Sequence, residues 1–68
     1  MVNIELLKSR IDESGITITA LADKMGVSRE TFYNRLESPD TFKLSEVVGL
    51  SKALNLPSKD VRQIFFKI

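Results

Sequence analysis

Apolar side chains recur along this chain at intervals of three and four residues, and turn-forming residues separate the periodic stretches. Ile4, Leu7 and Ile11 lie at i, i+3 and i+7, which places them on one face of a helix. No stretch alternates with a period of two for long enough to indicate a strand. The pattern therefore predicts an all-α chain of five short helices. They cover residues 3–13, 18–25, 29–37, 44–54 and 59–66.

Residues that start and stop helices support these boundaries. Asn3, Thr17, Ser28 and Ser58 stand where the side chain of an N-cap can accept a hydrogen bond from a backbone N–H of the first turn. Gly26 follows the second helix, where a positive φ is needed for a tight turn. The fourth helix is the exception, because it has Lys43 at the position that a Ser or Thr cap would occupy, three residues before Glu46.

One glycine does not mark a helix end. Gly49 lies in the middle of the fourth helix, where glycine costs about 1 kcal/mol relative to alanine. Close packing against a neighbouring helix would explain it. We therefore expect another helix to approach the fourth one at this point.

Residues 18–37 form one unit with the pattern of a helix-turn-helix. In this motif two helices meet at a steep angle through a short turn. Ala22 provides a small side chain at the crossing, and Gly26 provides the turn. Val27 fills the core from the turn, and Phe32 anchors the second helix on its inward side. The outward side of that helix is then free to enter a DNA major groove.

The outward face of the third helix carries side chains that can recognise bases. Arg29 suits guanine, Asn34 suits adenine, Glu30 suits cytosine, and the methyl group of Thr31 suits thymine. Every surface helix has a solvated polar face. The composition of this face therefore supports DNA binding only in combination with the helix-turn-helix pattern. Glu30 has a second interpretation, an ion pair with Arg29 or Arg35.

The segment LADKMGVSRETF, residues 21–32, resembles the Cro/repressor-type (XRE-like) helix-turn-helix of phage and plasmid regulators. The segments SRETFYNRL (28–36), LNLPS (54–58) and IFF (64–66) are similar to small prophage regulators of low-GC Gram-positive bacteria. The resemblance implies one compact five-helix, lambda-repressor-like DNA-binding domain over residues 1–68. It also implies a homodimer on a near-palindromic operator, which is how such proteins dock on double-stranded DNA.

The resemblance also implies roles for individual residues. Arg29, Glu30 and Asn34 match base-reading positions of the family, with Tyr33 as an alternative to Asn34. Residues 38–43 match its second phosphate-binding segment. The predicted phosphate contacts are Thr17, Thr19, Ser28, Thr31, Arg35 and Lys43.

The C-terminal apolar residues allow two interpretations. Val61, Ile64 and Phe65 already form one inward stripe of the fifth helix, and Phe66 and Ile68 fall on a different face. Either all of them complete the monomer core, or Phe66 and Ile68 form a dimer seam. We favour the seam, because the inward stripe is already filled without these two residues. A dimer would also double the DNA contacts of a chain with few cations.

Composition restricts the function further. The sequence has no Cys and no His, which excludes disulfides, thiolate metal sites and catalysis by Ser-His or Cys-His pairs. The acidic residues considered for acid–base catalysis are expected on exposed helix faces or ends, with none in the core. They are Asp12, Glu13, Asp23, Glu30, Glu37 and Asp40. We therefore expect no enzymatic activity, metal, cofactor or small-molecule ligand.

Net charge and hydropathy say less about the partners of this protein. Ten Lys/Arg and nine Asp/Glu give a net charge of +1. The isoelectric point of 8.1 lies below the value of about 9 that nucleic-acid-binding domains often exceed. No membrane span is expected, because no apolar run approaches about 18 residues. The N-terminus does not resemble a signal peptide, so the bacterial cytoplasm is the expected location.

The sequence thus predicts a transcriptional regulator, a Cro-like repressor that occludes promoter DNA. The alternative is a small helical protein-interaction module, such as an antitoxin, antirepressor or assembly factor. The near-neutral charge favours the alternative, and the outward face of the third helix favours DNA.

Overall fold

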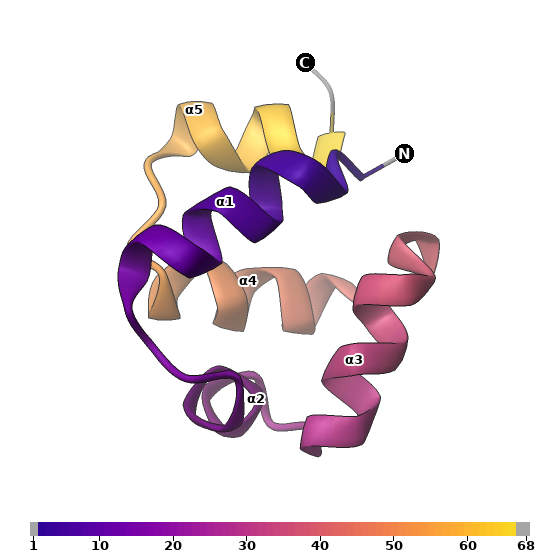
Figure 1. Cartoon of the computed structure of the whole chain (residues 1–68). Coiled ribbons are helices and arrows are strands. Elements are labelled where there is room, and N and C mark those ends of the chain that lie inside the picture. The colour runs from indigo at the N-terminus through magenta and orange to yellow at the C-terminus, as the bar shows by residue number, and fades with distance from the viewer. Residues whose placement is uncertain (1, 67–68) are drawn as a thin grey trace.

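The computed structural model describes residues 2–66, and all regular structure in this range is helical (Figure 1). The elements are α1 (Ile4–Ser14), α2 (Ile18–Met25), α3 (Arg29–Glu37), η1 (Pro39–Thr41), α4 (Leu44–Ala53), α5 (Ser58–Val61) and η2 (Arg62–Phe66). The predicted all-α class with five helices is confirmed. The 3-10 turn η1 was not predicted, and the second half of the predicted helix 59–66 is the π-helical turn η2, which continues α5.

Hydrogen bonds at the helix starts explain why the sequence locates them well. The Asn3 side chain accepts from the backbone N–H of Leu6 at 3.2 Å, and the Thr17 hydroxyl accepts from that of Ala20 at 3.1 Å. Both satisfy backbone donors that the helix itself leaves unpaired. These caps are made within three residues, so they form wherever the local sequence provides them.

The predicted cap at Ser58 is wrong. Helix α5 begins at Ser58 itself, and Pro57 occupies the N-cap position. The Pro57 carbonyl accepts from the backbone N–H groups of Asp60 and Val61 at 2.9 and 3.1 Å. The helix therefore starts one residue earlier than expected and without a side-chain cap.

Helices α1 and α5 lie side by side, α4 runs beneath them, and α2 and α3 form the opposite end of the molecule (Figure 1). The backbone N–H of Asn3 donates to the carbonyl of Ile64 at 2.6 Å, and Arg10 binds Asp60 at 3.0 Å. These bonds join the two terminal segments. The helix-turn-helix unit thus lies at the end away from both termini.

One apolar core holds the helices together. Five side chains are fully enclosed, and α1, α2, α3, α4 and η2 contribute one each. They are Leu7, Leu21, Phe32, Leu50 and Ile64. Because each of these elements buries a residue in the same cluster, the position of α3 is fixed by the whole domain.

The predicted close approach at Gly49 is present. A Cβ atom at this position would lie 3.2 Å from the carbonyl oxygen of Lys24 and 3.3 Å from the Cα of Met25. Both atoms belong to the backbone at the end of α2, so a side chain could not simply displace them. Glycine at this position lets α4 pack directly against the helix-turn-helix unit.

Candidate nucleic-acid interface

The turn between α2 and α3 has the geometry that the sequence predicts. Gly26 adopts a φ of 77°, in the left-handed region. Its N–H donates to the carbonyl of Asp23, and the N–H of Val27 donates to that of Ala22, both at 3.0 Å. This pair of bonds is a Schellman motif, which satisfies the last carbonyls of α2 and sends the chain away sharply. Ala22 is buried and Val27 packs against the core.

Ser28 starts α3 immediately after this turn. Its hydroxyl oxygen accepts from the backbone N–H of Thr31 at 3.0 Å, and the hydroxyl donates to the Thr31 side chain at 2.9 Å. One hydrogen bond thus joins the two hydroxyls, which leaves one hydroxyl hydrogen of the pair for an outside acceptor.

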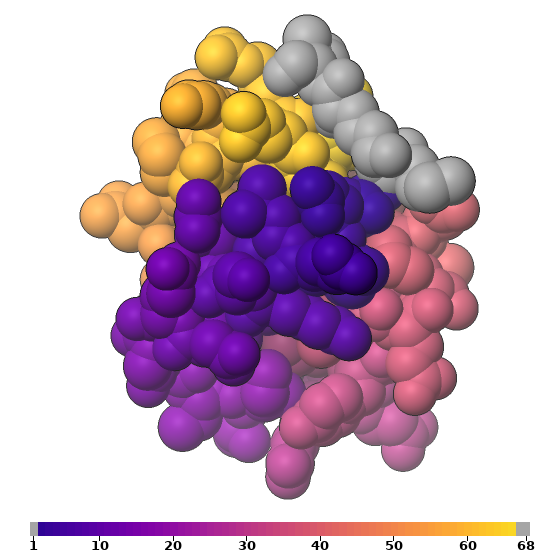
Figure 2. All heavy atoms as spheres, turned by 45° about the horizontal axis from the view of Figure 1, so that its top comes forward, coloured from indigo at the N-terminus to yellow at the C-terminus, as the bar shows by residue number. Residues whose placement is uncertain are grey.

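The outward side of α3 is uncovered along its length. Arg29, Glu30, Tyr33 and Asn34 are exposed, while Phe32 between them is completely buried. Figure 2 shows another face of the packed molecule, on which α1 and η2 are prominent and α2 and α3 lie toward the lower edge. No segment among residues 2–66 lies over the four side chains, so they are available to a partner.

One contact joins two side chains on this face. The guanidinium carbon of Arg29 lies 5.5 Å from the centre of the Tyr33 ring, within cation–π distance. Among the described residues no ion pair joins Glu30 to Arg29 or Arg35. The interpretation of Glu30 as a base-reading residue thus has no competing contact in the structure.

Arg35 does not lie free on the surface. Its Nε donates to one oxygen of Glu46 at 2.8 Å and a terminal nitrogen donates to the other at 3.2 Å, so the pair is bidentate. The side chain of Glu46 is 5% exposed and that of Arg35 is 20% exposed. Arg35, a predicted phosphate contact, is held against α4 by this pair.

Glu46 also corrects the expectation that the core holds no carboxylate. It is buried at the start of α4 and accepts from the backbone N–H of Lys43 at 3.0 Å. The hydrogen bonds from Arg35 hold the pKa of Glu46 below its ordinary value, against the opposing effect of burial. The sequence did indicate a capping role for Glu46, because a Glu at the third position of a helix commonly caps it. It did not indicate the ion pair, because Arg35 lies eleven residues away on α3.

The other predicted phosphate contacts are exposed. Thr17 and Thr19 lie at the start of α2, and Lys43 lies at the N-cap of α4. Because Glu46 bonds both to Arg35 and to the Lys43 backbone, the position of Lys43 is tied to α3. The lysine side chain is a donor only, so α4 has half of a capping box, as expected.

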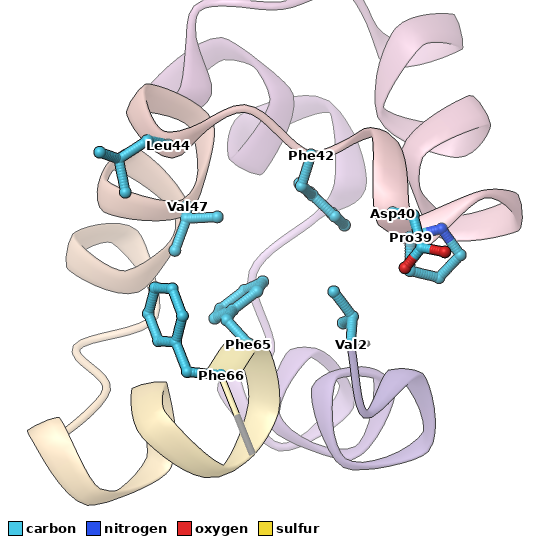
Figure 3. Close-up of a pocket in the computed structure, with 8 residues that line it drawn as sticks. All are labelled: Val2, Pro39, Asp40, Phe42, Leu44, Val47, Phe65 and Phe66. Carbon is cyan, nitrogen blue, oxygen red and sulfur yellow. The ribbon is translucent and has the colours of Figure 1, made fainter. Parts of the chain in front are cut away.

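A second surface feature is apolar. Phe42, Leu44, Val47, Phe65 and Phe66 surround an open pocket of about 320 Å³, which Val2, Pro39 and Asp40 complete (Figure 3). Leu44 and Phe66 are 71% and 51% exposed. The sequence singled out Phe66 but missed the rest of this pocket, because its walls come from segments far apart in the chain. Ile68, the other predicted seam residue, lies outside the described residues.

Nothing in the described part of the chain indicates a metal centre, since no three acidic side chains gather there. Each helix within residues 2–66 is too short or too polar to span a bilayer. In comparisons with models of protein families, with curated proteins and with solved structures, no match to this chain reaches significance.

Proposed function

We propose that this protein binds double-stranded DNA in a sequence-specific manner through the outward face of α3. The observation that carries the proposal is the exposure of Arg29, Glu30, Tyr33 and Asn34 on one helix directly after a tight turn. A helix of this kind fits the major groove, where its first residues reach base edges. The resemblance to the Cro/repressor-type helix-turn-helix supports the same interpretation.

Phosphate contacts would orient the domain on the duplex. The start of α2, with Thr17 and Thr19, offers hydroxyls and free backbone N–H groups at the positive end of a helix dipole. Lys43 offers an exposed cation at the start of α4. Two of the five N–H donors of Arg35 are bound to Glu46, so this arginine could reach a phosphate only with its remaining donors and from the position that the ion pair gives it.

The biological role we propose is that of a Cro-like repressor in a bacterial cytoplasm, which acts by covering promoter DNA. The protein would bind as a homodimer to a near-palindromic site. The apolar pocket that Leu44 and Phe66 border supports this, since exposed apolar surface of this kind favours association. A dimer would place two copies of α3 about 34 Å apart, one turn of the duplex.

The same pocket supports the second candidate function, an interaction module for another protein such as an antitoxin or antirepressor. Its walls are mainly apolar, and the net charge of +1 gives no strong attraction to nucleic acid. In that case the polar face of α3 would be an ordinary solvated surface. The two candidates differ in their response to salt and DNA sequence.

Selection of bound sites from random duplex DNA tests the proposal. A base preference repeated in two half-sites about 10 base pairs apart would support a dimer of DNA readers. Binding should weaken steeply between low salt and about 200 mM salt, because phosphate contacts release counterions. No enrichment of any sequence, together with no retention on DNA at low salt, would favour the interaction module.

The variant Arg29→Ala makes this test residue-specific. We expect it to relax the preference at one base position and to cost about 1–3 kcal/mol in binding free energy on the selected site. The measurement is binding to the selected site and to single-base variants of it. An equal loss on every sequence would assign Arg29 to a phosphate instead.

A further inference from the structure

We propose that Tyr33 is a positioning residue for Arg29, and that the two side chains together recognise a guanine. This inference rests on the proposed DNA-binding function and adds to it the means by which the side chain that reads guanine is held. The two residues are four apart on α3, so their side chains share one face of the helix. The guanidinium carbon of Arg29 lies 5.5 Å from the centre of the Tyr33 ring.

Arg29 differs from two other arginines of the chain in how its head group is used. Arg10 binds Asp60 and Glu13, and Arg35 binds Glu46. Within residues 2–66 no hydrogen bond or ion pair is made by the Arg29 guanidinium, and the ring of Tyr33 is its contact. Arg29 is thus held without any of its N–H donors being consumed.

Contact with an aromatic ring is suited to this purpose. A guanidinium presents its flat side to the ring, while its five N–H groups point outward in its own plane. Guanine offers two acceptors, O6 and N7, to two such donors in the major groove. A guanidinium that is already held loses less side-chain freedom on binding than one that moves freely, so its selectivity for guanine is greater.

Core packing does not explain the tyrosine. Its neighbour Phe32 is completely buried and anchors α3, whereas Tyr33 is 43% exposed. No hydrogen bond to the Tyr33 hydroxyl occurs among the described residues. In the free protein, the contact of Tyr33 that we identify is therefore the one between its ring and the guanidinium of Arg29.

The test compares Tyr33→Phe with Tyr33→Leu. Phenylalanine keeps the ring and should preserve the preference for guanine, measured as the affinity ratio between the selected site and its single-base variants. Leucine removes the ring and should lower this ratio by two- to fivefold, the value of an exposed cation–π contact. Equal thermal melts of both variants and the wild type show that the fold is retained.

The Arg29→Ala background distinguishes positioning from direct contact. If Tyr33 acts through Arg29, Tyr33→Leu changes no base preference once Arg29 is absent. A further loss in that background, or a loss in Tyr33→Phe equal to that in Tyr33→Leu, would mean that Tyr33 contacts DNA itself and would overturn the inference.

Failure of this inference is separable from failure of the proposed function. If the wild type selects no sequence, the proposed function fails. If the wild type prefers a guanine that Arg29→Ala ceases to prefer, while Tyr33→Leu still prefers it fully, only the positioning role fails. Loss of affinity on all sequences alike in Tyr33→Leu would also reject it, because a merely structural role has that effect.

Discussion

The ion pair between Arg35 and Glu46 gives the most direct test of how the domain is held together. Glu46 accepts three hydrogen bonds, two from Arg35 at 2.8 and 3.2 Å and one from the Lys43 backbone at 3.0 Å. These bonds connect α3 to the start of α4. Replacing Glu46 with alanine removes all three and leaves the Lys43 N–H without its acceptor.

The expected cost follows from burial. Breaking a fully buried ion pair costs about 3–5 kcal/mol, whereas an exposed pair contributes about 0–1 kcal/mol. The Glu46 side chain is 5% exposed, but Arg35 is 20% exposed and can turn to water. We therefore expect Glu46→Ala to lower the free energy of unfolding by about 2–3 kcal/mol, a large share of the ~3–5 kcal/mol that a core of this size supplies.

The pH dependence supplies an independent check. The pKa of Glu46 is lower in the folded protein than its ordinary value of about 4.5, because Arg35 donates to its charged form. The pair therefore contributes fully above pH 4.5, and its contribution is lost as the pH falls through the folded pKa. Glu46→Gln has no such titration, so the difference in stability between it and the wild type should shrink as the pH falls below 4.5 and through the lowered pKa of Glu46.

Urea unfolding followed by far-UV circular dichroism measures both effects, because the domain is helical. Glu37→Ala, which removes an exposed carboxylate from α3, is the matched control and should stay within about 0.5 kcal/mol of the wild type. If Glu46→Ala behaves like this control, the pair is solvated and the reasoning is refuted. A wild-type advantage over Glu46→Gln that stays constant through the acid range would refute the pKa argument.

Two further substitutions test the phosphate contact and the helix packing. Lys43→Ala should weaken DNA binding evenly on all sequences and reduce the slope of log affinity against log salt by about 0.9 per bound protomer, measured by titration at several salt concentrations; a changed base preference would contradict a phosphate role. Gly49→Ala should lower the free energy of unfolding by roughly 1 kcal/mol, because the strain of pressing a methyl group against the α2 backbone exceeds the gain in helix propensity. A higher melting temperature of this variant would show that α2 and α4 separate easily.

The sequence predicts the helices well because their ends depend on neighbouring residues. Thr17 and Ser28 cap α2 and α3 through bonds to residues three positions away, and Gly26 ends α2 through a turn of its own. Asn55 ends α4 in the same way, with a φ of 53°. Ser58 is the instructive failure, because Pro57 starts α5 before that serine can act as a cap.

The local sequence pattern also determines which side chains of α3 are exposed. Once Phe32 is buried, helical geometry turns Tyr33 and Asn34 outward, and the sequence predicts both. The contact between Arg29 and Tyr33 also lies within one turn.

The ion pair and the apolar pocket depend instead on how the helices pack. Arg35 and Glu46 meet because α3 packs against the start of α4, and Phe42 meets Phe65 edge to face at 5.8 Å because η2 lies beside the segment that precedes α4. Hydrogen bonds within a turn are set by residues three or four apart, so the amino-acid order alone determines them. Contacts between residues eleven or more apart require a particular angle and spacing of helices, which the shared core fixes only when the whole domain has folded.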